Sequence, residues 1–241
     1  MNNPTAAMIV IGDEILSGRT QDTNSNYLAV QLTLMGVDLK EIRVVSDDQA
    51  QIIGAVNRLR MKYTNVFTSG GIGPTHDDIT ADCIAKAFGV SIDIRADARA
   101  ALAKNYENPE IELTEARLRM ARIPDGAELI DNPVSKAPGF SIENVHVMAG
   151  VPTIFKAMLA GLLPKLTSGQ EILSENINLK MKEGDIAKHL GVIAQENPDT
   201  SIGSYPYYTN GTFGCNLVVR SPDADRVQQV AALIRKTFSE D

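Results

Sequence analysis

The sequence predicts an α/β protein in which helices cover both faces of a mostly parallel sheet, followed by a small α+β domain. In the first part of the 241-residue chain, short apolar runs alternate with helical patterns, which is typical of parallel sheets. After residues 164–169, a stretch that contains Pro and Gly, the order changes to strand, helix, strand, strand and helix. We therefore expect two domains, at residues 1–168 and 169–241.

The first strand is predicted at residues 6–12, a continuous apolar run of the kind buried on both faces. A helix with apolar residues on one face follows it. We expect Asn24 or Ser25 to cap the N-terminus of this helix and Gly36 to end it. Residues 39–45 form the second predicted strand.

Asp48 opens the next predicted helix, whose apolar residues again recur on one face. Residues 66–68 form the third predicted strand. The helix after it starts near Ile79, keeps its apolar side chains at helical spacing and ends at Gly89. A glycine-rich turn therefore joins this strand to a helix N-terminus.

Further helical patterns occur at residues 96–106 and 115–123, and Pro124 stops the second of them. Residues 141–142 and 145–149 are predicted strands.

Pro152 stands at a favourable first helical position and starts the last helix of the first domain, which ends at Leu163. In the second domain, the dipeptide Asn210-Gly211 between two strand patterns predicts a type I′ hairpin turn. The elements of this domain are a strand at residues 177–181, a helix at 185–195, strands at 201–207 and 213–220, and a helix at 222–238.

The composition excludes several classes of protein. The net charge is −7 without a basic run, which disfavours nucleic-acid binding. The most apolar stretch is too short to span a bilayer. Cys83 and Cys215 are too far apart for a CxxC metal or redox motif. We therefore expect a cytoplasmic protein that binds a small molecule and has neither nucleic acid nor membrane as a partner.

The most informative feature is the run TSGGIGPTHDDIT at residues 68–80. A turn between a strand and a helix N-terminus directs backbone N–H groups and the positive end of a helix dipole at one point, which suits a phosphate. Its glycines let a bulky anion approach the backbone closely. Asp77 and Asp78 would repel a bare phosphate, so we expect them to hold Mg²⁺ or another hard cation.

A purely structural role is the alternative for this run, because strand-to-helix loops are often glycine-rich and an aspartate there can be a helix cap. Two familiar phosphate-binding motifs are absent from the sequence. There is no P-loop, and His76 replaces the third glycine of G-x-G-x-x-G. The predicted phosphate site is therefore of another type.

Acidic residues also follow the first two predicted strands, at the edge where ligands of open α/β sheets bind. Asp13 and Glu14 follow the first strand, and Asp47 and Asp48 follow the second. Like charges brought together are costly unless a cation compensates, so the pattern favours a divalent metal such as Mg²⁺, Mn²⁺ or Co²⁺. For Asp48 we favour a helix cap, and for Asp13 and Glu14 a solvated turn is an equal alternative.

Two other loops are candidates for the same site. Lys136, within residues 132–140, is either a counter-charge for a phosphate or an exposed lysine. Residues 150–153 repeat the arrangement of a glycine before a helix start and either hold a second phosphate or simply begin the helix. Ser69 has no histidine in a position to activate it, so no nucleophile triad is predicted. What remains is metal-assisted attack on a phosphoanhydride, with aspartates as metal ligands or general base.

Over almost its whole length, the chain resembles the amino-terminal part of the CinA family, which has the molybdopterin-binding fold. The resemblance implies a three-layer α/β fold and a loop that binds a pterin pyrophosphate or an adenylylated pterin with Mg²⁺. The matching motifs are GDEILSG at residues 12–18, DTN at 22–24, the long run at 69–80, APGF at 137–140, GVP at 150–152 and IGSYP at 202–206.

The resemblance also implies roles for individual residues. Asp78 matches the family's loop aspartate and Asp47 the acidic residue after the second strand, so both are predicted to be catalytic. With the acidic pattern, the candidate metal ligands are Asp13, Glu14, Asp77 and Asp78. The candidate phosphate- or ligand-binding residues are Ser69, Gly70, Gly71, Gly73, Pro74, Thr75, Thr80, Asn24, Lys136 and Gly139.

CinA-type domains are linked to ADP-ribose hydrolysis, and a related domain of eukaryotic FAD synthases to FAD cleavage. The resemblance therefore implies a metal-dependent nucleotide-diphosphate pyrophosphatase. The alternatives are a molybdopterin-binding or molybdopterin-adenylylating protein of cofactor biosynthesis, and a non-catalytic ligand-binding module. Ser135-Lys136 stands where the family pattern has Gly-Thr. We expect a homo-oligomer, either a dimer or a trimer, and no deamidase domain of the kind that full-length CinA carries.

Overall fold

The protein is described by a computed structural model over residues 3–209 and 211–238. The chain divides into two compact units, Met1–Gly169 and Gln170–Asp241. Within the described ranges, no helix combines the length and the apolar character that crossing a membrane requires.

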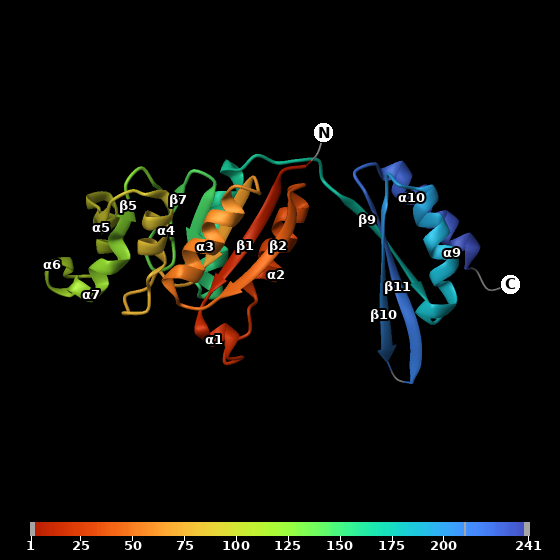
Figure 1. The fold of residues 1–241 in the computed structure, drawn as a ribbon, viewed down its shortest axis with the longest axis horizontal. Helices are drawn as coiled ribbons and strands as arrows, with labels where there is room; N and C mark the ends of the chain where they lie inside the picture. Colours follow the sequence, from red (N-terminus) through yellow and green to blue (C-terminus); the bar gives the residue numbers. More distant parts are fainter. Residues whose placement is uncertain (1–2, 210, 239–241) are drawn as a thin grey trace. The chain divides into compact units, whose positions relative to one another are not determined.

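The first unit is built on one main sheet, in which β1 and β2 lie side by side (Figure 1). Within the described residues, its strands run in the order β2-β1-β3-β8-β7-β6. Neighbours from β2 to β8 pair in parallel, whereas β7 and β6 pair antiparallel. The prediction of a mostly parallel sheet is confirmed, and the carboxyl ends of the parallel strands meet at one edge. The strands are β1 (Thr5–Ile11), β2 (Asp38–Val45), β3 (Asn65–Ser69), β6 (Glu128–Ile130), β7 (Gly139–Ile142) and β8 (Val145–Met148).

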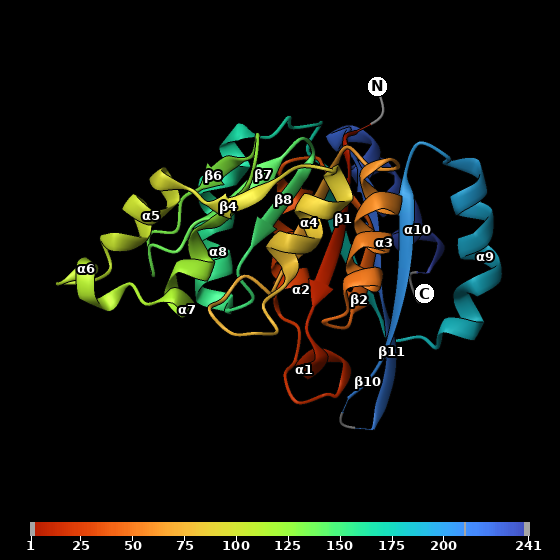
Figure 2. The same ribbon diagram turned by 60° about the vertical axis from the view of Figure 1, so that its left-hand side comes forward.

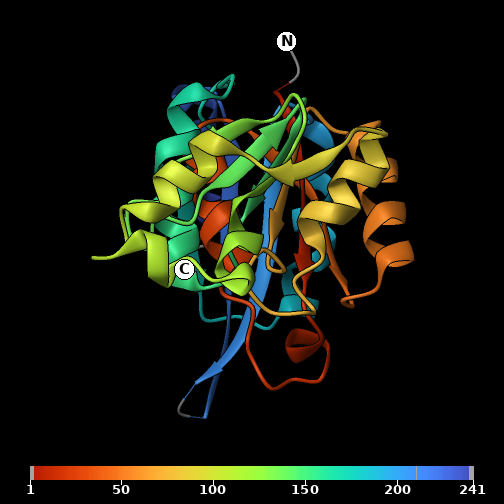
Figure 3. The same cartoon turned by 90° about the vertical axis from the view of Figure 1, so that its left-hand side faces the viewer.

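Helices cover both faces of this sheet, as predicted (Figures 2 and 3). Met8 and Val10 of β1 pack in the same cluster as α2 and α8, whereas Ile9 and Ile11 pack with α3 and α4. Because successive side chains of a strand point to opposite faces, β1 is buried on both sides at the centre of a three-layer unit. These helices are α2 (Asn24–Leu34), α3 (Gln49–Arg60), α4 (Thr80–Phe88) and α8 (Pro152–Leu162).

The helices that start at the carboxyl edge are capped in different ways. The Asp48 side chain accepts a hydrogen bond from a backbone N–H in the first turn of α3, at 2.9 Å, which confirms it as the cap. The prediction that Asn24 or Ser25 caps α2 is wrong, because Thr23 occupies the cap position. The Asp22 carboxylate accepts from the N–H groups of both predicted residues, at 3.0 and 3.1 Å. The Asn24 side chain is therefore left for other contacts.

The segment between α4 and β6 differs most from the prediction. The helix predicted at residues 115–123 ends early, and its last residues form β5 (Arg122–Pro124), which pairs with β4 (Ile92–Ile94). Ile123 is buried there, so a non-local pairing overrides a local helical pattern. The remaining short helices are α1 (Asp13–Leu16), α5 (Ala96–Ala103), α6 (Pro109–Glu112), α7 (Glu115–Leu118), η1 (Arg119–Ala121) and η2 (Leu163–Lys165).

The second unit is a three-stranded antiparallel sheet, in the order β10-β11-β9 among the described residues, with two helices. Ile177 and Leu217 of the sheet pack with Ile186 and Ile234 of the helices in a separate core. Strand pairing continues to Thr209 opposite Thr212, and Asn210 of the predicted turn lies outside the described residues. The elements are β9 (Leu173–Leu179), α9 (Glu183–Glu196), β10 (Ser201–Thr209), β11 (Thr212–Ser221) and α10 (Ala224–Thr237).

His146 of β8 is buried in the first unit. Its Nδ1 lies 2.9 Å from the Ser141 hydroxyl, and its Nε2 lies 3.2 Å from the side-chain oxygen of Asn65. Burial lowers the pKa of His146 from 6.5 to about 4, so the imidazole is neutral at physiological pH.

Acidification is therefore expected to destabilise the first unit as the pH falls from 6.5 to about 4. In that window the unfolded chain binds a proton at His146 that the folded chain does not, so the free energy of unfolding falls by about 3 kcal/mol in total. Urea unfolding at neutral and at acidic pH measures this loss. His146→Gln should flatten this pH dependence, whereas His76→Gln, at a fully exposed side chain, should keep it. Equal pH dependence in both variants would contradict the assignment.

Candidate functional site

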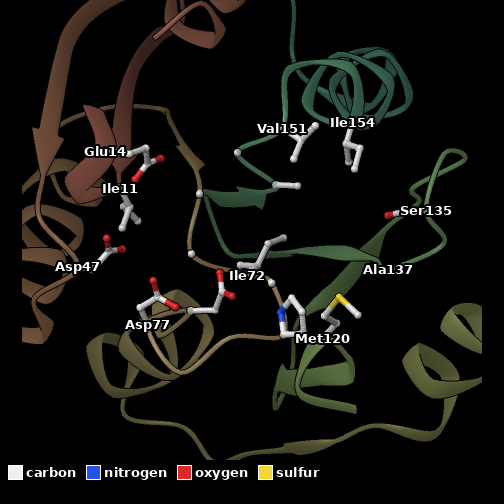
Figure 4. Close-up of a pocket in the computed structure, with 18 of the residues that line it drawn as sticks. Ile11, Glu14, Asp47, Ile72, Asp77, Met120, Ser135, Ala137, Val151 and Ile154 are labelled. Atoms are coloured by element: carbon white, nitrogen blue, oxygen red, sulfur yellow. The ribbon is translucent and has the colours of Figure 1, made fainter. Parts of the chain in front are cut away.

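A pocket of about 510 Å³ opens at the carboxyl edge of the sheet, where the loops after β1, β2, β3 and β8 meet (Figure 4). This edge is where open α/β folds bind their ligands. The loop that contains Asn132, Ser135 and Ala137 and the more distant Met120 also line the pocket. The four strand-end loops contribute Gly12, Glu14, Asp47, residues 70–74, Asp77, Asp78, residues 149–152 and Ile154.

The glycine loop, defined here as residues 70–78, follows β3 in a conformation that favours glycine. Gly70 and Gly71 have φ angles of +110° and +69°. A Cβ on Gly70 would overlap the backbone carbonyl of Ile11, and a Cβ on Gly71 would overlap the Thr80 hydroxyl. Two hydrogen bonds from Thr80 hold the loop in this conformation. The Thr80 hydroxyl donates to the Gly70 carbonyl and the Thr80 N–H donates to the Gly71 carbonyl, both at 3.0 Å.

Three successive backbone N–H groups of the glycine loop, those of Gly71, Ile72 and Gly73, have no acceptor among the described residues. All three residues line the pocket. The N-terminus of α8, at Val151 and Pro152, borders the same pocket and adds the positive end of a helix dipole. Unpaired N–H groups beside a helix N-terminus form an environment that attracts an anion.

Asp78 is engaged within its own loop. Its Oδ2 accepts a hydrogen bond from the Thr75 N–H at 2.8 Å and a shorter one from the Thr75 hydroxyl. The backbone carbonyl of Asp78 accepts from the Arg119 guanidinium at 3.0 Å. Asp78 therefore shapes the glycine loop as well as bordering the pocket.

Carboxylates occupy one side of the pocket, where Figure 4 shows Glu14, Asp47 and Asp77. Burial raises the pKa of Asp47, and the charges of Asp13, Glu14 and Asp77 raise it further. The backbone N–H of Asp13, 3.0 Å from Oδ2 of Asp47, lowers this pKa in part. These carboxylates therefore repel one another, and a bound cation would relieve the repulsion.

No lysine or arginine lines this pocket in the part of the chain that the structure describes. Lys136, predicted as a counter-charge for a phosphate, instead donates from Nζ to the Pro133 carbonyl of its own loop, at 3.0 Å. The pocket thus combines backbone donors for an anion with an acidic side and no cationic side chain among the described residues.

A divalent cation fits this arrangement when it arrives with a phosphate ligand. Among residues 3–209 and 211–238, no three Asp, Glu, His or Cys side chains are grouped closely enough to hold a metal by themselves. Mg²⁺ usually keeps several waters and binds through one or two carboxylates plus substrate phosphates. The carboxylates of Glu14 and Asp77 supply the oxygen donors that hard cations prefer.

The other side of the pocket is largely apolar. Met120, Val151 and Ile154 lie there, with the Ser135 hydroxyl beside them (Figure 4). Sequence reasoning did not single out Met120 or Ile154, whereas Val151 belongs to the loop at residues 150–153 that it named as a possible second phosphate site. A flat ring could lie against this wall, since ligand pockets are mostly apolar with a few placed polar groups.

The structure brings only part of the predicted site together. Asn24 and Ser69 line a smaller cavity that adjoins the pocket. Gly139 is buried in β7, where a Cβ would overlap the Val147 carbonyl. The predicted residues that line the pocket are Glu14, Asp47, Gly70, Gly71, Gly73, Pro74, Asp77 and Asp78. Those that line neither cavity are Asp13, Thr75, Thr80, Lys136 and Gly139.

Two family models match the chain. The model described as probable molybdopterin binding domain matches residues 7–168, and the model described as FAD synthase, middle domain, matches residues 171–241. The two matches correspond to the two compact units.

Individual relatives and a solved structure also match most of the chain. A protein of Archaeoglobus fulgidus is 36% identical over 199 residues, which cover 83% of this chain and 84% of that protein. A probable FAD synthase of Caenorhabditis elegans is 32% identical over 260 residues, and the chain spans about half of its length (98% of this chain, 50% of that protein). The crystal structure of the protein CinA from Thermoplasma acidophilum is 36% identical with a TM-score of 0.63, and covers 68% of this chain and 99% of that one.

Proposed function

Because this chain belongs to the molybdopterin-binding domain family and is CinA-like, we propose that its pocket hydrolyses a nucleotide diphosphate of the ADP-ribose or FAD type with the help of a divalent cation. The observation that carries the proposal is the charge composition of the pocket. Unpaired backbone N–H groups and carboxylates line the same pocket, and in the described residues no basic side chain lines it. The matches to a probable FAD synthase and to an FAD synthase domain favour a nucleotide as the ligand.

A comparison of charge repulsion with hydrogen-bond energy explains why the proposed reaction needs a cation. Two unit charges of like sign about 4 Å apart repel by about 4 kcal/mol at the effective dielectric of a protein surface. A hydrogen bond from a backbone N–H to a charged oxygen returns only about 1.5–3 kcal/mol. A diphosphate beside Glu14, Asp47 and Asp77 therefore binds well only when a divalent cation offsets the repulsion.

The residues of the chain then have distinct tasks. A bound cation would neutralise the diphosphate and polarise its phosphorus–oxygen bonds. The N–H groups of Gly71, Ile72 and Gly73 bind non-bridging oxygens. Asp47 accepts a proton from the attacking water as the general base.

In the reaction, the water oxygen bonds to one phosphorus and the bond from that phosphorus to the bridging oxygen breaks. ADP-ribose and water thus give AMP and ribose 5-phosphate, and FAD and water give AMP and flavin mononucleotide. Asp47 passes the proton of the water to solvent.

Incubation of the purified protein with ADP-ribose or FAD tests the proposal. AMP release is expected with at least one of Mg²⁺, Mn²⁺ and Co²⁺, and chelation with EDTA should stop it. The absence of AMP with all three metals, beside an active pyrophosphatase control, would refute hydrolysis. Metal-dependent binding without AMP release would instead identify a non-catalytic ligand-binding module.

The apolar side of the pocket favours a second candidate, a molybdopterin-binding or molybdopterin-adenylylating protein. A flat pterin can lie against Met120, Val151 and Ile154 while its phosphate reaches the glycine loop. This candidate predicts tight pterin binding and ATP-dependent adenylyl transfer. Failure to rescue a strain that lacks the cofactor-synthesis step would count against it.

A further inference from the structure

We propose that Ser135 is a specificity-determining residue of the pocket, whose hydroxyl donates a hydrogen bond to a ring nitrogen of adenine in the ligand. The proposal rests on the proposed function and narrows its substrate class. ADP-ribose and FAD share an adenosine diphosphate half, so a ring site that serves both compounds takes adenine. Adenine nucleotides are thereby distinguished from diphosphates that carry another ring or no ring.

The hydroxyl of Ser135 borders the apolar side of the pocket. Figure 4 shows the Ser135 oxygen directed into the pocket, near Val151 and Ile154. Ser135 is partly exposed, so a ligand in the pocket can reach this oxygen. The volume of about 510 Å³ lies within the range of about 300–1,000 Å³ that is usual for ligand sites, and it has room for a ring next to a diphosphate.

The buried Asn132 sets the direction of the hydrogen bonds around Ser135. The side-chain oxygen of Asn132 accepts from the N–H groups of Val134 and Ser135, both at 3.1 Å. The amide nitrogen of Asn132 donates to the Ala137 carbonyl at 2.8 Å. A backbone N–H can only donate and a carbonyl can only accept, so these three contacts fix the orientation of the amide.

The Ser135 hydroxyl therefore accepts from Asn132 and cannot donate to it. The distance between the Asn132 amide nitrogen and the Ser135 oxygen is 2.7 Å. A serine hydroxyl has one hydrogen, and that of Ser135 has no acceptor among the described residues. Ser135 thus presents to the pocket a donor that an acceptor on the ligand can pair.

The surroundings of this donor suit a neutral ring better than a phosphate. Met120, Val151 and Ile154 are apolar, and a charge placed against them with a single hydrogen bond would lose most of its hydration. A flat ring can instead contact these side chains with its faces and accept from Ser135 at its edge. Adenine has such acceptors at its ring nitrogens N1, N3 and N7.

Ile72 connects this part of the pocket with the glycine loop. Its backbone N–H is one of the three unpaired groups proposed to bind the diphosphate, and Figure 4 shows its side chain extending into the pocket. A diphosphate at the glycine loop therefore has an apolar contact beside it for the group that it carries. The sequence also makes this recognition particular to the chain, because the family pattern has glycine where Ser135 stands.

Ligands that the protein cannot hydrolyse test the proposal by affinity alone. α,β-Methylene-ADP carries the whole adenosine diphosphate half, and its 1-deaza, 3-deaza and 7-deaza analogues each replace one ring nitrogen by a C–H group. Calorimetry with Mg²⁺ should show that at least one analogue binds to the wild-type protein about threefold to tenfold more weakly than the parent compound. This factor is the contribution of one hydrogen bond between neutral groups.

Two variants of the same shape separate the hydrogen bond from packing. Ser135→Thr keeps the hydroxyl, whereas Ser135→Val has a methyl group in its place. Ser135→Val should bind α,β-methylene-ADP about threefold to tenfold more weakly and should no longer distinguish it from the disfavoured analogue. Ser135→Thr should keep the wild-type discrimination. Ribose 5-methylenediphosphonate, which has no ring, should bind equally to all three proteins, and melting temperatures show whether the variants are folded.

Each outcome decides the proposal. Equal affinity of the wild-type protein for the parent compound and all three analogues would overturn it even if Ser135→Val fails to fold, and would leave the proposed hydrolysis standing. Discrimination that persists in folded Ser135→Val would assign the ring nitrogen to another donor and overturn the role of Ser135.

The same loss in Ser135→Thr, or a loss that extends to the compound without a ring, would indicate altered packing and would also overturn the role of Ser135. If Ser135→Val weakened only the methylenediphosphonate of riboflavin, the ring site would belong to flavin and not to adenine. Binding of none of these compounds with Mg²⁺ would overturn both this proposal and the proposed function.

Discussion

Gly70→Ala is expected to destabilise the first unit by about 2–6 kcal/mol and to abolish ligand binding at the glycine loop. With a φ of +110°, a residue other than glycine pays about 1–3 kcal/mol in backbone strain. Its Cβ would also overlap the carbonyl of Ile11, at the end of the buried central strand β1, where overpacking adds about 1–3 kcal/mol. Native domains have only about 5–15 kcal/mol of stability, so this loss would be a large fraction of the total.

Urea unfolding followed by circular dichroism measures the effect, because the chain contains no tryptophan. Gly54→Ala is the matched control. It is the same chemical change within α3, and apart from the neighbouring backbone of that helix its Cβ meets no atom of the described residues within 4 Å. The control should gain about 0.5–1 kcal/mol, because alanine is a better helix former than glycine. If Gly70→Ala were as stable as the wild type, the conformation of the glycine loop described here would be wrong.

Asp47→Asn is expected to lower metal-dependent AMP release by about 100-fold or more while leaving the protein folded. The amide can still accept the hydrogen bond from the Asp13 N–H, but it cannot take a proton from water, and general-base catalysis contributes about 10²–10⁴-fold. The raised pKa of Asp47 means that its negative charge is disfavoured in the folded state without a metal. The variant should therefore be at least as stable as the wild type at neutral pH, and this gain should disappear as acidification protonates Asp47.

Asp48→Asn provides the comparison for this prediction, because it makes the same change at the adjacent residue. Asp48 caps α3 and does not line the pocket, and asparagine is about as good a cap as aspartate. The rate of AMP release by Asp48→Asn should stay within about twofold of the wild type, because the substitution lies outside the proposed active site. Similar losses in both variants would show that general charge reduction, and not the position of Asp47, controls the rate.

The parallel part of the fold could be predicted because its signals are local. The apolar run that forms β1 and the amphipathic pattern of α3 each specify their own element. The pairing of Ile92–Ile94 with Arg122–Pro124 could not be predicted, because a three-residue strand is too short to show a period and its partner lies far along the chain. The helix predicted from the local pattern of residues 115–123 therefore included residues that form part of β5 in the folded protein.

The acidic side and the glycine loop could also be predicted, because these residues directly follow strands that end at the same edge. The apolar side could not, since Met120 and Ile154 come from segments whose sequence contains no signal for a ligand. Lys136 shows a third case: its charge suggested a phosphate contact, but its φ of +61° and its bond to a carbonyl of its own loop hold it elsewhere. Local turn geometry of this kind is not visible in a pattern of residue types.

The pairing of β3 with β8 has a consequence for how the protein folds during its synthesis. The glycine loop leaves the ribosome well before residues 149–154, which close the pocket from the end of β8. Until β3 and β8 pair, the glycine loop of the nascent chain has no pocket beside it. Pairing between strands that are far apart in the sequence is slow. The proposed nucleotide ligand would thus stabilise only the completed unit, so recovery of ligand affinity during refolding should coincide with the slowest phase.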